Sequence, residues 1–117
     1  MLFVETSEEM PSEHFVHSFF QCLGELGVLR AAAALLVGRP QTVCRGQAVA
    51  GGRAAYRAAQ RAAILRAVGE YCAADRPLPV LFGLDFGHTD PQVLVPCGGT
   101  ATIDAAQSTL TFSYGRS

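Results

Sequence analysis

The chain has 117 residues, of which 50% are hydrophobic and 16% are charged, and its formal net charge is −1. This length suits one domain with a single core, and the composition excludes an intrinsically disordered chain. Its nine basic residues, all arginine, are outnumbered by ten acidic ones, whereas nucleic-acid-binding proteins normally carry a positive excess. No apolar run approaches the roughly 18 residues of a membrane-spanning helix, so we expect no membrane contact.

The first half of the chain predicts a strand, a helix and a second strand. Residues 2–4 form a short apolar strand, and Ser12 is a suitable N-cap for the helix that follows, which Gly27 ends. We expect the helix to bury the apolar residues that recur at three- and four-residue spacing, namely Phe15, Phe19, Cys22, Leu23 and Leu26. Residues 33–37 are wholly apolar, which is typical of a strand buried on both faces.

The second half predicts a loop, a long helix and a group of strands. Residues 41–53 indicate a glycine-rich loop, and residues 54–74 repeat like an alanine-rich helix. Strands are expected at 79–83, 93–95, 100–103 and 108–112, with a turn at 104–107. The order β-α-β-α-β-β-β-β is typical of an α/β domain with short buried strands, two main helices and an antiparallel C-terminal group.

Three arginines of the long helix, Arg53, Arg57 and Arg61, repeat at four-residue spacing on the face opposite the apolar one. The main interpretation is a solvated face, which is the usual role of such a row. The alternative is a site for an anion or a partner.

The four cysteines, Cys22, Cys44, Cys72 and Cys97, include no Cys-x-x-Cys pair, which argues against a structural zinc site. We predict that Cys22 and Cys72 are reduced and buried, as in a cytoplasmic protein. The first residues lack the basic segment of a signal peptide. A strand-like run with a single residue before it suggests a domain of a longer protein. No cofactor and no metal are expected.

His88 is the residue at which the chain most clearly offers chemistry. It follows Gly87, lies between Asp85 and Asp90, and comes soon after the apolar strand at 79–83. A histidine at the end of a buried strand can reach a cleft, and its unperturbed pKa of about 6.5 suits proton transfer at neutral pH. The alternative is a turn histidine that bonds to the backbone, with Asp85 and Asp90 as turn-stabilising acceptors.

Three early acids, Glu5, Glu8 and Glu9, could supply a carboxylate partner for His88, and Glu5 is the most suggestive of them. It follows the first strand, and if the two strands lie side by side, both side chains emerge at one edge of the sheet. A carboxylate there would fix the imidazole tautomer and stabilise its charged form. The alternative is a strand-terminal glutamate that points into water, since such glutamates are common.

A nucleophile for this pair is not evident in the sequence. There is no Gly-x-Ser-x-Gly elbow, and the serines lie in ordinary contexts. Cys97, in the glycine-rich turn at 96–99, is a minor candidate and more simply a strand-end cysteine. A metal site of His88, Asp85 and Asp90 is a weak pattern.

Several motifs occur in order along the chain: Phe-Val-Glu-Thr-Ser-Glu-Glu at 3–9, Leu-Leu-Val-Gly-Arg-Pro at 35–40 and Gly-Leu-Asp-Phe-Gly-His-Thr-Asp-Pro at 83–91. Leu-Val-Pro at 94–96 with a glycine turn and Thr-Ile-Asp at 102–104 follow. Together they resemble the C-terminal domain of the LD-carboxypeptidase family of serine peptidases, over nearly the whole chain. That family includes muramoyltetrapeptide carboxypeptidases and microcin C immunity (MccF-like) peptidases, and the motifs look closer to the MccF-like branch.

The resemblance implies a swivelling β/β/α-type domain over residues 1–117 and a Ser-His-Glu triad in which Glu5 and His88 are catalytic. In the family, the serine and the oxyanion hole belong to an N-terminal domain. We expect that this domain is absent here and that the chain alone is inactive. The stretch from Glu5 to His88 is longer than the family pattern implies, with the surplus at 46–63.

The resemblance further implies hydrolysis of an LD-peptide or amide bond, in a muropeptide during peptidoglycan recycling or in a microcin-like conjugate. Expected partners are the substrate, the N-terminal domain and a second copy in a homodimer. Arg39, Thr89 and Asp90 are candidate substrate contacts; Arg39 could meet a carboxylate through its bidentate fork or could cap a loop instead. The rival function is a non-catalytic binding or dimerisation domain.

Overall fold

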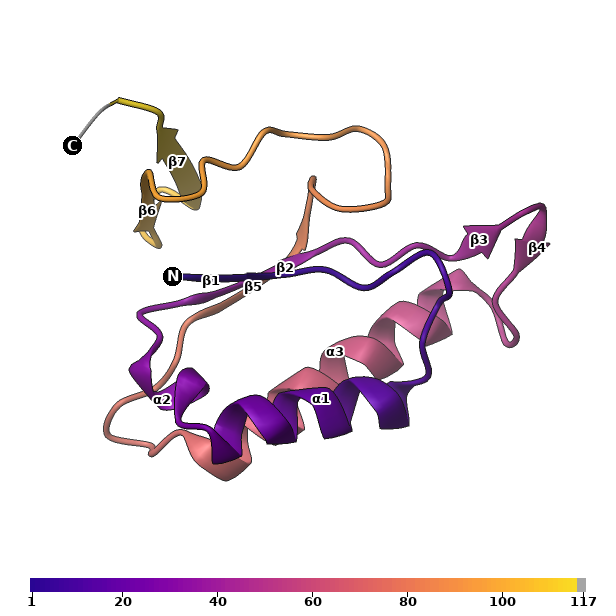
Figure 1. Ribbon diagram of the computed structural model, residues 1–117, viewed down its shortest axis with the longest axis horizontal. Helices are drawn as coiled ribbons and strands as arrows, with labels where there is room; N and C mark the ends of the chain where they lie inside the picture. The colour runs from indigo at the N-terminus through magenta and orange to yellow at the C-terminus, as the bar shows by residue number, and fades with distance from the viewer. Residues whose placement is uncertain (116–117) are drawn as a thin grey trace.

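The computed structural model describes residues 1–115. Its elements are β1 (Leu2–Val4), α1 (Glu13–Glu25), α2 (Val28–Ala31), β2 (Leu35–Gly38), β3 (Val43–Cys44), β4 (Gln47–Ala48), α3 (Arg53–Tyr71), β5 (Val80–Leu84), β6 (Thr100–Asp104) and β7 (Thr109–Ser113). The long helices α1 and α3 lie together on one side of the β1-β2-β5 sheet, and the β6–β7 hairpin lies on the other side (Figure 1). The predicted mixed α/β architecture with an antiparallel C-terminal strand pair is confirmed.

Strand β2 is the centre of a three-stranded parallel sheet with the order β1-β2-β5. All of its residues are buried, as the apolar run predicted for a strand covered on both faces. Because the three strands are parallel, their carboxyl ends meet at one edge of the sheet. Glu5, Arg39 and the segment after Leu84 all leave from that edge.

The core lies between this sheet and the two long helices. Phe20 of α1 and Leu35 of β2 are at most 1% exposed, and they pack with Ile64 and Ala67 of α3. Helix α1 begins after Ser12, whose hydroxyl accepts a hydrogen bond from the Phe15 N–H at 3.1 Å, as predicted for an N-cap.

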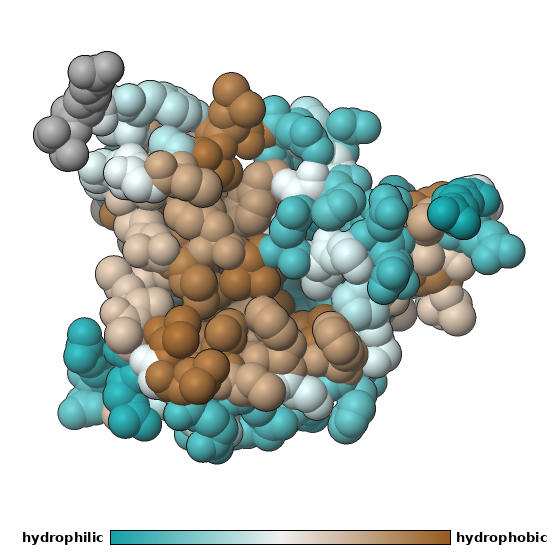
Figure 2. Space-filling model, in the orientation of Figure 1, coloured by the Kyte–Doolittle hydropathy of each residue, from teal (hydrophilic) through white to brown (hydrophobic). Residues whose placement is uncertain are grey.

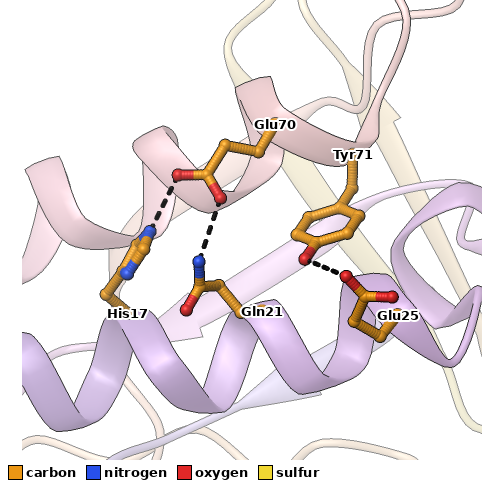
Figure 3. Close-up of polar contacts among 5 residues, drawn as sticks. All are labelled: His17, Gln21, Glu25, Glu70 and Tyr71. Carbon is orange, nitrogen blue, oxygen red and sulfur yellow. Dashed lines mark hydrogen bonds and ion pairs between the residues drawn. The ribbon is translucent and has the colours of Figure 1, made fainter.

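A row of polar contacts joins α1 to the end of α3 (Figure 3). His17 Nε2 lies 3.0 Å from Glu70 Oε1, and Gln21 donates to the other carboxylate oxygen at 3.2 Å. The Tyr71 hydroxyl donates to Glu25 at 2.7 Å. The hydrogen bonds from His17 and Gln21 lower the pKa of Glu70, and the hydrogen bond to Glu25 raises the pKa of Tyr71 to about 12.

The inward face of α1 differs from the predicted one. The helix buries Val16, His17, Phe20 and Gly24. A Cβ at Gly24 would overlap the Tyr71 ring, so only glycine fits at this helix crossing. Of the predicted stripe, only Leu23 packs against the core, and Phe15, Phe19, Cys22 and Leu26 are exposed.

Two further local predictions are wrong. Residues 93–95 form no strand: Val93 donates its N–H to the carbonyl of Asp85, which follows β5, and Leu94 is 83% exposed. The expected loop at 41–53 contains the β3–β4 hairpin, which turns at Arg45 and Gly46 with positive φ at both. Among residues 1–115, no helix has the length and apolar character needed to cross a membrane.

Candidate functional site

Glu5 and His88 meet at the carboxyl edge of the sheet although they are 83 residues apart in the chain. His88 Nδ1 lies 3.1 Å from Glu5 Oε2, and the two side chains are 41% and 43% exposed. When the imidazole donates from Nδ1 to the carboxylate, its Nε2 is the nitrogen that accepts a proton. An imidazole held in this way on an open surface is suited to act as a general base.

The two residues follow strands that are not neighbours, since β2 lies between β1 and β5. They meet because the chain after β5 passes over the end of β2. Gly38, the last residue of β2, permits this crossing: a Cβ there would lie 2.5 Å from the carbonyl oxygen of Phe86 and 3.1 Å from its ring. The predicted meeting of Glu5 and His88 at one edge is therefore achieved by a crossing loop and not by adjacent strands.

Gly87 brings the histidine against the carboxylate. Its φ is +103°, a conformation that favours glycine, and a Cβ on this residue would overlap the Glu5 carboxylate. The Gln92 side chain donates to the Gly87 carbonyl, and the Phe86 ring packs edge-to-face on Phe3 with centroids 5.8 Å apart. Gly38, Phe86 and Gln92 were not identified from the sequence, because their roles depend on a close approach between segments that no local pattern reports.

Arg39 is held by Asp85. The guanidinium forms an ion pair with this carboxylate, and both side chains are about one-third exposed, at 30% and 37%. The Arg39 N–H also donates to the Leu84 carbonyl at 2.9 Å. Asp85 therefore ties the end of β2 to the start of the histidine loop, which is consistent with a turn-stabilising role.

Thr89 and Asp90 continue the histidine loop. The Thr89 hydroxyl is buried and has no hydrogen-bond partner among residues 1–115. Asp90 is exposed. Neither side chain contacts the Glu5–His88 pair through a hydrogen bond within the described chain.

Cys97 lies elsewhere in the fold. It is exposed and lines a hollow with Met1 and Phe3, at the opposite end of β1 from Glu5. All four cysteines are unpaired. Within the part of the chain that the structure describes, no three His, Cys, Asp or Glu side chains gather as a metal site would require.

The family described as the LD-carboxypeptidase C-terminal domain matches residues 1–103. The chain belongs to the LD-carboxypeptidase family. The match to this peptidase family includes both Glu5 and His88. The resemblance inferred from the sequence motifs is thus confirmed. No curated protein matches the chain at a significant level.

Among solved structures, this LD-carboxypeptidase domain is similar to an MccF-like protein from Streptococcus pneumoniae, determined in complex with AMP. The identity is 26% and the TM-score 0.71, over 97% of this chain. The aligned region is 28% of the MccF-like chain, so the domain spans well under half the length of that relative.

Proposed function

We propose that this domain supplies the glutamate and the histidine of a Ser-His-Glu triad in a serine carboxypeptidase that hydrolyses an LD-peptide or amide bond. The 3.1 Å contact between His88 Nδ1 and Glu5 Oε2 is the observation that carries the proposal. Its position supports the same function, because α/β proteins bind ligands outside the carboxyl ends of their parallel strands.

In this mechanism, His88 Nε2 takes the proton of the serine hydroxyl as its oxygen attacks the scissile carbonyl. The protonated imidazole then gives that proton to the leaving amine. Glu5 accepts from Nδ1–H throughout, which fixes the tautomer and stabilises the imidazolium. Asp85 holds the histidine loop through Arg39, and Thr89 and Asp90 border the substrate.

We place the serine and the oxyanion hole on a second, N-terminal domain. Triad chemistry needs a nucleophile, and an imidazole–carboxylate pair alone forms no acyl-enzyme. The greater length of the MccF-like relative supports an arrangement with more than one domain. The 117-residue chain alone is then inactive.

The substrate is a muropeptide tetrapeptide or a microcin-like conjugate, and the enzyme acts in the cytoplasm, in peptidoglycan recycling for the first of these. The MccF-like relative was solved with AMP, which supports the inclusion of nucleotide-linked conjugates among the substrates to be tested.

Two assays test the proposal. The 117-residue chain alone is expected to leave an LD-linked tetrapeptide intact, and robust turnover would refute the need for a second domain. In the complete enzyme, Glu5→Gln is expected to reduce kcat by about 10³- to 10⁴-fold with the fold retained. A loss below tenfold would remove Glu5 from the triad.

A non-catalytic binding or dimerisation domain is the second candidate, and the outer face of α1 favours it. Figure 2 shows a hydrophobic surface over α1, where Phe15, Phe19 and Leu26 are 62%, 45% and 77% exposed. Patches of this kind often mark protein contacts. Sedimentation of the wild-type chain and of Phe15→Ser measures the association, and unchanged catalysis in Glu5→Gln would favour this candidate over the peptidase.

A further inference from the structure

A cavity of about 190 Å³ opens between the carboxyl edge of the sheet and helix α3. It begins beside the proposed catalytic pair, because Thr6, one of its lining residues, directly follows Glu5. Its volume is many times the roughly 10–15 Å³ that one water molecule requires. The space is therefore large enough for a small polar group of a ligand together with water.

Two hydrogen-bond donors of this cavity have no partner. Arg57 Nε and the Thr6 hydroxyl are buried, and neither forms a hydrogen bond within residues 1–115. Gln60 is 4% exposed, and its side-chain amide donates to the Pro11 carbonyl at 2.9 Å, while the amide oxygen has no partner among residues 1–115. Since buried polar groups are nearly always hydrogen-bonded, the two donors, Arg57 Nε and the Thr6 hydroxyl, are suited to a ligand that accepts two hydrogen bonds.

The charge of the cavity is positive and incompletely balanced. Arg39, Arg57 and Arg61 line it, and none of the lining residues is acidic in the described chain. Asp85 balances Arg39, and the Arg61 guanidinium lies over the Phe82 ring at 5.4 Å.

Arg57 forms no ion pair with a described residue. Burial, with the nearby Arg53 and Arg39, lowers the pKa of Arg57, and the opposite charge of a bound anion would offset this lowering. The expected solvated arginine row is thus only partly correct: Arg57 and Arg61 line the cavity and Arg53 does not.

We propose that this cavity is a subsite for a small oxyanion, a carboxylate or a phosphate, bound by the Arg57 guanidinium and the Thr6 hydroxyl. A guanidinium fork matches the two oxygens of either group. The role in catalysis rests on the proposed function: an anion held beside Thr6 would fix one end of a substrate whose scissile bond faces His88.

The binding test uses the 117-residue chain and NMR detection of the arginine Nε–H and backbone amide signals. The chain is titrated with inorganic phosphate and, separately, with acetate at constant ionic strength. Saturable shifts at Arg57 and Thr6 are expected with at least one of the two anions, and the tighter one identifies the group. Absence of saturation with both anions at tens of millimolar would overturn the proposal.

Matched arginine variants separate a site from general charge attraction. Arg57→Gln is expected to weaken binding at least about tenfold, because it removes charge-assisted hydrogen bonds. Arg66→Gln, a change of the same charge on the same helix outside the cavity, is expected to bind like wild type. Equal losses in both variants would overturn the proposal. If Arg57→Gln unfolds, Arg57→Lys provides the test: it retains the charge and is expected to bind more weakly because it lacks the fork.

The proposed anion subsite and the proposed catalytic triad can be tested independently. Glu5→Gln and His88→Ala are expected to leave anion binding unchanged, since neither residue lines the cavity. Normal anion binding with an inactive complete enzyme would reject the proposed function and retain the subsite. An active complete enzyme whose domain binds no anion would reject the subsite and retain the proposed function.

Discussion

Residues 1–115 contain two imidazole–carboxylate pairs of nearly the same length in very different surroundings. His88 Nδ1 lies 3.1 Å from Glu5, and His17 Nε2 lies 3.0 Å from Glu70. The His17 side chain is 10% exposed between two helices, whereas that of His88 is 41% exposed at the sheet edge. The two pairs therefore differ in the exposure of the histidine side chain and not in the distance between the partners, and only the exposed pair is suited to the proposed proton transfer.

The two pairs are also built by different means. Glu70 and His17 are brought together by the packing of α1 on α3, which forms much of the core. Glu5 and His88 are brought together by glycines, Gly38 under the crossing segment and Gly87 against the carboxylate. Substitutions at the His17–Glu70 pair should therefore mainly lower stability, whereas substitutions at the Glu5–His88 pair should mainly lower activity.

The largest expected effect comes from exchanging the two histidines for alanine in the complete enzyme. His88→Ala should lower kcat by at least about 10³-fold and leave the melting temperature nearly unchanged. His17→Ala should lower the melting temperature and retain the kcat of the folded fraction, because it removes a buried side chain and a partner of Glu70. Steady-state kinetics and thermal unfolding measure the two effects. Similar losses of kcat in both variants would contradict the assignment of a catalytic role to His88 and a structural role to His17.

The next effect concerns Gly87. Gly87→Ala should displace the Glu5 carboxylate and reduce kcat about 10²-fold or more, through loss of an oriented imidazole. Gly98→Ala is the control, since Gly98 also has positive φ, at +78°, but an added Cβ there meets open space. NMR of the His88 ring nitrogens reports the tautomer in each variant. Equal effects of the two substitutions would assign the loss to backbone strain and not to the contact with Glu5.

A smaller effect is expected at acid pH. The folded-state pKa of Glu70 is lowered, so its pair with His17 contributes stability above the unfolded pKa of about 4.5 and loses it as the pH falls through the folded value. Glu70→Gln should therefore show a flatter fall in melting temperature at acid pH than wild type. Glu9→Gln, a change on an exposed loop, should retain the wild-type acid sensitivity. Parallel curves for wild type and Glu70→Gln would contradict this role.

The smallest effect is expected at alkaline pH. The pKa of Tyr71 is raised to about 12, so its neutral form contributes stability below pH 10, and this contribution is lost as the pH rises from about 10 to about 12. Ultraviolet titration of the phenolate, compared between wild type and Tyr71→Phe, measures that pKa. Glu25→Gln should lower it, because the hydrogen bond to Glu25 is the main cause of the shift. An unchanged pKa in Glu25→Gln would exclude that cause.

The sequence was sufficient where the signal is local. Ser12 as an N-cap and the apolar run of β2 depend on neighbouring residues alone, and both are present in the structure. The sequence was insufficient where contacts between distant elements decide which residues are buried. Phe15 and Phe19 are as apolar as Val16 and Phe20, so only the position of α3 and the sheet selects the buried pair.

At the candidate site, too, local features could be predicted from the sequence and features that depend on packing could not. The residue types and their places after strands made Glu5 and His88 candidates, and the resemblance of the motifs to a family was needed to favour a catalytic role for Glu5. The strand order β1-β2-β5 and the crossing at Gly38 were not predictable, because each depends on contacts between segments far apart in the chain. The arginine row likewise became a cavity wall only when α3 was packed near the end of β2.

The two members of the proposed catalytic pair depart from the outer strands of the sheet, and the central strand separates them. Outer strands have fewer neighbours than a central one, so they are the first to loosen as temperature rises. Any sliding of β1 or β5 relative to β2 would change the separation of Glu5 and His88 while the helices stay packed. Heating should accordingly abolish turnover in the complete enzyme several degrees before the helical circular dichroism signal of this domain declines.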